Sequence, residues 1–195
     1  TEAEPWVMAP MVSSVEDTED FMAMCRERDL KMAGIMVETP SAAVLADWML
    51  QSADFASIGT NDLTQYTMAA DRMLGSLAHL NDPWQPAVLR LVAATCDGAR
   101  KAGGDPDTYG DEANKPVGVC GEAAGDPALA VVLVGLGVNS LSMTPRSLPA
   151  VAKVLSTVTI EKARELAQAA VNSRTAQEAR EQVRAALPVL DEIGL

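Results

Sequence analysis

The sequence predicts an α/β fold built on a parallel sheet. Short apolar runs alternate with longer segments of helical periodicity along most of the chain, which is typical of repeated strand–helix units. The chain has 195 residues, of which 48% are hydrophobic and 22% charged, so one sizeable core can form. The sequence contains no GxGxxG fingerprint and no P-loop, which argues against the usual dinucleotide and Walker-type sites. The repeated units therefore favour a barrel or a doubly wound sheet.

The charge balance restricts the possible partners. Net charge is −12, from 27 acidic and 15 basic residues, and such a surface repels nucleic acid and anionic membranes. No uncharged apolar run is long enough for insertion into a membrane. Cys25, Cys96 and Cys120 are widely spaced without a CxxC pair, which favours a reduced, cytoplasmic setting, and we expect no secretory signal. An anionic substrate would need an arginine, a metal ion or a helix N-terminus.

Five short apolar runs predict the strands. The predicted strands cover residues 6–11, 32–37, 55–60, 117–120 and 140–143, and we expect the first four to be buried. Gly59 gives the backbone freedom to turn where the third strand ends. The sheet should therefore present five strand ends at one edge, because parallel strands all run in the same direction.

The segments between the strands predict helices. Expected helices cover residues 15–28, 41–50, 64–70, 86–100, 127–136 and, with a break at 172–173, most of 145–195. Ser13 with Glu16 three residues later is a capping pattern for the first helix, and Pro86 suits a first helical turn. Cys25 and Cys96 lie on apolar helical stripes, so we expect both in the core. Residues 103–116 carry glycine, proline and acidic residues and predict an exposed, mobile loop.

Polar side chains gather where the predicted strands end. Glu38, Asn61, Asp62, Cys120 and Glu122 all fall at carboxyl ends of strands, where functional groups of parallel α/β folds meet. Two carboxylates from adjacent strands suit Mg²⁺, which leaves its other positions to water and substrate. For single residues the alternatives are a helix cap for Asp62, a surface acid for Glu38 and a core residue for Cys120.

One cation lies close to this group in sequence. Arg72 follows the Asn61–Asp62 pair by about ten residues and could fold back over an anionic ligand, although most such arginines are simply solvated. Beside a metal ion, the Cys120 thiol can act as a proton donor. The one histidine, His79, falls in a loop, so Ser/His/Asp catalysis is not indicated.

Four segments together resemble a known family. They are residues 34–40 (GIMVETP), 57–67 (SIGTNDLTQYT), 71–72 (DR) and 120–127 (CGEAAGDP). In this order they resemble the C-terminal domain of the phosphoenolpyruvate-utilising enzymes, and most closely that of Enzyme I of the bacterial sugar phosphotransferase system. The resemblance extends from about residue 7 to 157 and more faintly to the end of the chain.

The resemblance implies a (β/α)₈ TIM barrel that binds phosphoenolpyruvate (PEP). It implies that Glu38 and Asp62 ligate Mg²⁺, that Asn61 and the Asp62 backbone contact PEP, and that Arg72 holds its phosphate. Cys120 would protonate the enolate to give pyruvate, while the phosphoryl group passes to a histidine of an N-terminal domain absent from this sequence. The implied partners are the phosphocarrier protein HPr, reached through the parent enzyme, and a second copy of the chain in a homodimer.

The sequence also departs from that family. Only five strands are predicted where the barrel has eight, and His79 does not match the phosphorylated histidine. We therefore expect residues 1–195 to be a fragment of the PEP-binding domain, an incomplete barrel of about the last five strand–helix units, with C-terminal helices over about 158–195. The alternatives are a fragment of pyruvate phosphate dikinase or PEP synthase, or a non-catalytic dimerisation module.

Overall fold

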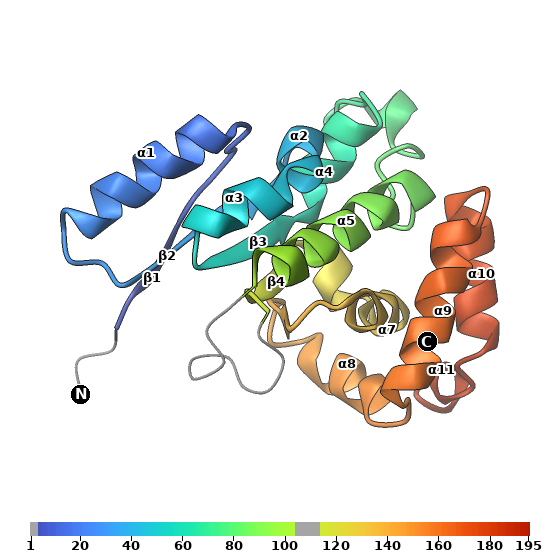
Figure 1. Ribbon diagram of the computed structural model, residues 1–195. Coiled ribbons are helices and arrows are strands. Elements are labelled where there is room, and N and C mark those ends of the chain that lie inside the picture. Colours follow the sequence, from blue (N-terminus) through green and yellow to red (C-terminus); the bar gives the residue numbers. More distant parts are fainter. Residues whose placement is uncertain (1–3, 104–113) are drawn as a thin grey trace.

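The computed structural model describes residues 4–103 and 114–195 and contains one parallel sheet (Figure 1). Its strands are β1 (Trp6–Ala9), β2 (Met32–Val37), β3 (Phe55–Gly59), β4 (Val117–Cys120) and β5 (Ser140–Leu141). They are hydrogen-bonded in the order β1-β2-β3-β4-β5, and every neighbouring pair is parallel. The predicted parallel α/β fold is thereby confirmed.

Helices connect the strands and complete the chain. They are α1 (Val15–Arg26), α2 (Pro40–Val44), α3 (Ala46–Ser52), α4 (Thr60–Thr67), η1 (Gly75–Leu77), α5 (Pro86–Ala102), η2 (Glu122–Gly125), α7 (Pro127–Leu136), α8 (Leu148–Leu155), α9 (Ile160–Asn172), α10 (Ala176–Ala185) and α11 (Val189–Glu192). No helix in the described ranges combines the length and apolarity needed to cross a membrane.

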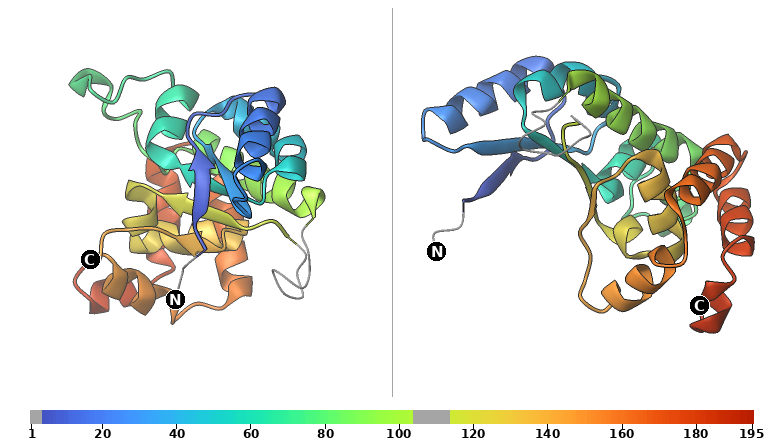
Figure 2. Two further views of the ribbon diagram at one scale, coloured as in Figure 1. Left: turned by 90° about the vertical axis from the view of Figure 1, so that its left-hand side faces the viewer. Right: turned by 60° about the horizontal axis from the view of Figure 1, so that its bottom comes forward.

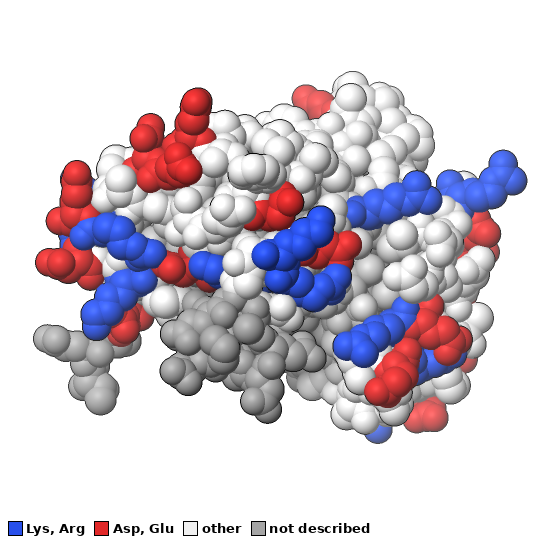
Figure 3. Space-filling model, in the orientation of Figure 1, with Lys and Arg blue, Asp and Glu red and all other residues white. Residues whose placement is uncertain are grey.

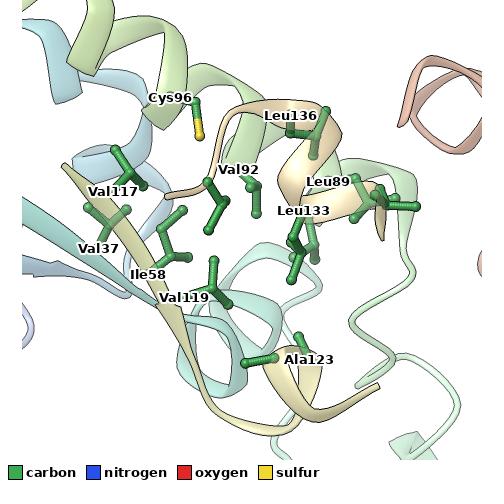
Figure 4. Packing of buried hydrophobic residues seen from close by; sticks show 14 of the residues in the cluster. Val37, Ile58, Leu89, Val92, Cys96, Val117, Val119, Ala123, Leu133 and Leu136 are labelled. Atoms are coloured by element: carbon green, nitrogen blue, oxygen red, sulfur yellow. The ribbon is translucent and has the colours of Figure 1, made fainter. Parts of the chain in front are cut away.

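The core lies between one face of the sheet and the helices. Side chains alternate along the strands, so Ile35, Ile58 and Val119 point to the same face and are buried. They meet apolar side chains of α5 and α7, as Figure 4 shows for Val92 and Leu133. Figure 2 shows the sheet curved, with the helices that follow the strands on its convex side.

The first strand is not buried as predicted. Trp6 and Met8 are 53% and 41% exposed, and only Ala9 of this strand is buried. β1 lies at an edge of the sheet, and the face that carries Trp6 and Met8 is covered only locally, by the Phe55 ring with its centroid 4.9 Å from that of Trp6. An apolar run predicts a strand, but it does not show how many of its faces are covered.

The helix after β3 begins earlier than predicted. α4 starts at Thr60 and not at Thr64, so Asn61 and Asp62 belong to its first turn instead of a preceding loop. The N-cap is Gly59, and no side chain caps this helix, so the alternative that Asp62 is a capping residue is wrong. The first turn of α4 therefore presents both polar side chains at the carboxyl end of β3.

Other boundaries differ by single turns. Ser14 caps α1 by accepting the N–H of Asp17, where the sequence pattern had placed the cap at Ser13. The helix predicted over residues 41–50 is divided at Leu45 into α2 and α3. The C-terminal region is four helices and not two, and β5 is two residues long. Of the loop predicted at 103–116, residues 104–113 lie outside the described residues.

Two of the three cysteines belong to the core, as predicted. Cys25 on α1 and Cys96 on α5 are both buried. Burial raises the pKa of the Cys96 thiol to about 12, so this thiol stays protonated at neutral pH.

Acidic side chains gather over α1, at the upper left of Figure 3, where the helix carries Glu16, Asp17, Glu19 and Asp20.

Candidate functional site

Glu38 follows β2 directly and turns inward at the carboxyl edge of the sheet. It is 7% exposed, and its Oε2 accepts the backbone N–H of Met11 at 2.9 Å. Its other oxygen, Oε1, accepts no hydrogen bond from the described residues. A β-carbon on Gly59 would lie 2.6 Å from both the Cγ and the Oε1 of Glu38. The lack of a side chain at the end of β3 therefore makes room for this carboxylate.

The first turn of α4 is joined to the end of β4. Thr60 donates its hydroxyl to the carbonyl oxygen of Cys120 at 3.0 Å. The Oδ1 of Asn61 accepts the backbone N–H of Glu122 at 3.5 Å, a long bond. Gly121, which lies between Cys120 and Glu122 in the chain, has φ of +93°. A β-carbon added to it would lie 2.8 Å from the Thr60 hydroxyl oxygen. Glycine is thus required where the chain leaves β4 beside α4.

Cys120 ends β4 and is only partly buried, unlike the two core cysteines. Its thiol donates to the carbonyl oxygen of Ile58 at 3.5 Å, so the sulfur lies between β4 and β3. The register places Cys120 opposite Gly59. Gly59 is therefore paired with Cys120 on one side by the strand register and faces the Glu38 carboxylate through the space its missing side chain leaves.

Two adjoining cavities open at this edge of the sheet. The smaller, of about 410 Å³, is lined by Thr60, Asn61, Thr64, Arg72, Met73, Ala78, Asn81, Pro83 and Glu122. The larger, of about 660 Å³, is lined by Asn61, Gly121, Glu122, Gly125, Asp126, Ser142, Met143, Thr144 and Ser147. Asn61 and Glu122 contribute to both and so form the wall between them.

The structure brings together some of the predicted site residues and leaves others apart. Asn61 and Arg72 line the same cavity. Glu38, Asp62 and Cys120 lie at the same edge but line neither cavity. Arg72 is held through its backbone, whose N–H donates to the Gln65 side chain at 3.0 Å, and its exposed guanidinium makes no ion pair within the described part of the chain.

Two carboxylates at this edge have oxygens without a partner among the described residues. Glu38 has one oxygen without a hydrogen bond, and Asp62 makes no side-chain hydrogen bond or ion pair with any described residue. Within the same ranges, no three His, Cys, Asp or Glu side chains cluster as a metal site. A Mg²⁺ site needs only one or two protein carboxylates, since water and substrate oxygens supply the rest.

Comparison with known proteins identifies the family. Residues 1–160 match the family model described as PEP-utilising enzyme, PEP-binding domain. The chain belongs to this family. It is 48% identical to the phosphoenolpyruvate-protein phosphotransferase of Streptomyces coelicolor. The match extends over 182 residues, which make up 93% of this chain and 31% of that protein.

Other relatives in the PEP-binding family have similar names. A multiphosphoryl transfer protein of Xanthomonas campestris is 42% identical, over 89% of the chain and 20% of its own length. A phosphoenolpyruvate-protein phosphotransferase of Haloferax volcanii is 41% identical, over 90% of the chain and 31% of its own length. The chain thus spans about a third or less of the length of these relatives.

Sequence reasoning missed several residues that line the cavities. Thr60 sits inside a motif that was recognised, yet its bond to the Cys120 carbonyl could not be foreseen. Asn81 lies in a turn-rich stretch with no periodicity, and Ser142 and Ser147 follow a strand of only two residues. Ser142 was predicted to lie inside a strand over residues 140–143, whereas β5 ends at Leu141 and leaves Ser142 beyond the strand end.

Proposed function

We propose that this chain is the part of a phosphoenolpyruvate-protein phosphotransferase that binds PEP and converts its enolate to pyruvate. The observation that carries the proposal is the cavity shared by Asn61 and Arg72 at the carboxyl edge of the sheet. Membership of the PEP-binding family and the names of the relatives support the same substrate and reaction. The alternatives, a dikinase or synthase fragment or a dimerisation module, have no comparable observation in their favour.

Each residue has a separate task in this proposal. Arg72 holds the phosphate, because a guanidinium offers two parallel N–H groups to phosphoryl oxygens. Asn61 and the backbone of the first turn of α4 contact the remaining oxygens, at a helix N-terminus that favours negative charge. The P–O bond of PEP breaks when the phosphoryl group leaves for a histidine of another domain. The Cys120 thiol then gives its proton to the methylene carbon of the enolate and completes pyruvate.

Glu38 and Asp62 would hold Mg²⁺ in this arrangement. The ion supplies positive charge next to the phosphoryl and enolate oxygens when it is bound. The bond from the Met11 N–H to Glu38 Oε2 fixes the carboxylate while its Oε1 is left for a metal. Burial of Glu38 supports this role, because a buried carboxylate without compensation is costly.

The arrangement of the sheet supports an incomplete TIM barrel. Five parallel strands follow the chain order without the reversal of a doubly wound sheet, and one face is covered by helices. We propose that residues 1–195 are one PEP-binding unit whose helices from about residue 158 onward pack on its outside. A homodimer, a cytoplasmic location and HPr as the protein partner of the complete enzyme follow from the same proposal.

Substitution of Cys120 by serine tests the catalytic part of the proposal. In the intact protein, Cys120→Ser should retain binding of PEP and Mg²⁺ while pyruvate formation falls by about 10²–10⁴, the range of a general acid, because a hydroxyl is a far weaker acid than a thiol. Cys25→Ser, in the buried core away from this edge, is the matched control and should lower stability with little change in rate. Near-normal pyruvate release by Cys120→Ser would show that Cys120 only packs.

A further inference from the structure

One wall of the smaller cavity is a stretch of irregular backbone. Ala78, Asn81 and Pro83 line the cavity from the segment 78–84, which lies between η1 and α5. Within this segment Asn81 donates its N–H to the carbonyl of Ala78, a local turn only. No ladder of a helix or strand fixes such backbone, so its shape depends on side-chain contacts.

Those contacts centre on Asp82, the residue between two cavity-lining neighbours. Its Oδ1 accepts the backbone N–H of Trp84 at 3.0 Å, which closes a turn within the segment. The Nη2 of Arg180 donates to both carboxylate oxygens, at 2.8 and 2.7 Å. The side chains of Arg180 and Asp82 are 40% and 20% exposed, so the pair is partly shielded from water.

Trp84 fastens the other side of the segment. Its indole is 1% exposed, and Nε1 donates to the Oδ2 of Asp126 at 2.9 Å. The Oδ1 of Asp126 accepts the N–H groups of Ala128 and Leu129, so the same carboxylate caps α7. Asp126 also lines the larger cavity. The Arg180 guanidinium carbon lies 5.8 Å from the centroid of the Trp84 ring, within range of a cation–π contact.

Arg180 comes from a distant part of the chain. It lies on α10, 98 residues from Asp82 and beyond residues 1–160 that match the family model. α10 packs mainly on α9 and α7. A side chain of the C-terminal helices thus contacts the segment that forms the cavity wall.

We propose that Arg180 is a positioning residue for the substrate cavity and that it acts through Asp82, Trp84 and Asp126. We call these four residues the Arg180 link. The inference rests on the function proposed above, since it assigns the cavity to PEP. The link joins α10, the segment 78–84 and the N-terminus of α7, and so fixes the wall that faces Arg72 and Asn61.

The state of Asn81 shows why this wall needs to be fixed. Both polar atoms of its side chain are buried, and neither has a hydrogen-bond partner within the described residues. A buried amide without a partner is unfavourable, so the segment has a reason to move if it is released. The link opposes that movement at two residues that closely follow Asn81 in the chain, by the ion pair at Asp82 and by the indole hydrogen bond of Trp84.

Loss of the link should weaken PEP binding without changing the chemistry. In Arg180→Met of the intact protein, we expect KM for PEP to rise about tenfold with kcat within about twofold, because only contacts common to ground and transition state are loosened. Arg180→Lys keeps the charge but not the forked geometry, and should fall between Arg180→Met and the unmodified protein. Arg184→Met is the matched control, because Arg184 is exposed on the same helix and makes no ion pair among the described residues.

Hydrogen exchange read by mass spectrometry gives a second measurement that does not depend on turnover. In Arg180→Met, amides of a peptide covering residues 78–85 should exchange about tenfold faster, while Arg184→Met leaves them unchanged. Faster exchange with an unchanged KM would overturn the positioning role, and so would a raised KM with unchanged exchange. A lower melting temperature with neither change would leave Arg180 as a purely structural residue. If the unmodified protein does not consume PEP, the proposed function fails, and exchange alone still decides whether the link holds the segment.

Discussion

Gly59→Ala tests whether the position of the Glu38 carboxylate matters, without changing any polar group. The backbone of Gly59 has φ of −86° and ψ of 88°, which an alanine can adopt. The added methyl group would lie 2.6 Å from the Cγ and Oε1 of Glu38 and 3.0 Å from its Cδ. Ordinary contact begins near 3.4 Å, so the carboxylate must move by about 0.8 Å.

The size of the effect follows from this displacement. Glu38 is a side chain with several rotatable bonds, so it can move without the sheet, and the loss of unfolding free energy should be near the lower end of the ~1–3 kcal/mol typical of overpacking. Its hydrogen bond from the Met11 N–H would be strained or lost. A misplacement of about 1 Å at a reacting centre costs about 10²-fold, so we expect kcat/KM for PEP to fall about 100-fold. That fall corresponds to about 2.7 kcal/mol in the activation free energy.

The assay compares Gly59→Ala with Gly75→Ala in the intact protein. An added β-carbon at Gly75 meets nothing within 4 Å, so the second variant controls for the change of residue type. Pyruvate release would be followed while Mg²⁺ is varied, and Gly59→Ala alone should need more Mg²⁺ to reach half of its maximal rate. If both variants keep normal kcat/KM and the same Mg²⁺ dependence, Glu38 is neither a metal ligand nor placed by Gly59.

Two further predictions concern stability and association. Burial raises the pKa of Cys96 from 9.0 to about 12. Between these pH values the unfolded state loses the thiol proton while the native state keeps it. The stability that the protonated thiol provides is therefore fully present below pH 9 and is lost as pH rises toward 12. Denaturant titrations at several pH values in this range should show the unfolding free energy of the unmodified protein falling more steeply with pH than that of Cys96→Ala, by up to about 1.4 kcal/mol per pH unit. Equal pH dependence of the two proteins would contradict the raised pKa of Cys96. The sheet has an unpaired edge at β1 and at β5, and Trp6 and Met8 are exposed. We therefore predict that the intact protein is a homodimer in light scattering at micromolar concentration. A monodisperse monomer would count against this prediction.

Local patterns account for the features that could be read from the sequence. The apolar runs at β2, β3 and β4 predicted strands at nearly the observed bounds, because each run is long enough to be buried and is followed by a turn residue. The same logic placed Glu38 and Cys120 at strand ends. Where a run had only one covered face, as at β1, the prediction of burial was wrong because the neighbouring layer is not encoded in the run itself.

Helix starts were harder to predict than strands. The start of α4 was placed four residues late, since Gly59 as an N-cap without a side chain leaves none of the usual signal. α1 begins one residue after its actual cap, Ser14, and two neighbouring serines cannot be distinguished by pattern alone. These shifts are small in residues, yet the one at α4 decides that Asn61 and Asp62 stand on a helical turn.

By itself, the sequence determined the parallel α/β class, the ends of β2, β3 and β4 to within one residue, and the family to which its motifs belong. The tertiary structure alone decided that Asn61 and Arg72 share a cavity, that Gly59 makes room for Glu38, and that Arg180 reaches Asp82. The physical reason is the separation along the chain of the residues that interact. Periodicity and capping depend on residues a few positions apart, whereas a cavity or an ion pair spanning 98 residues depends on how whole helices pack against the sheet.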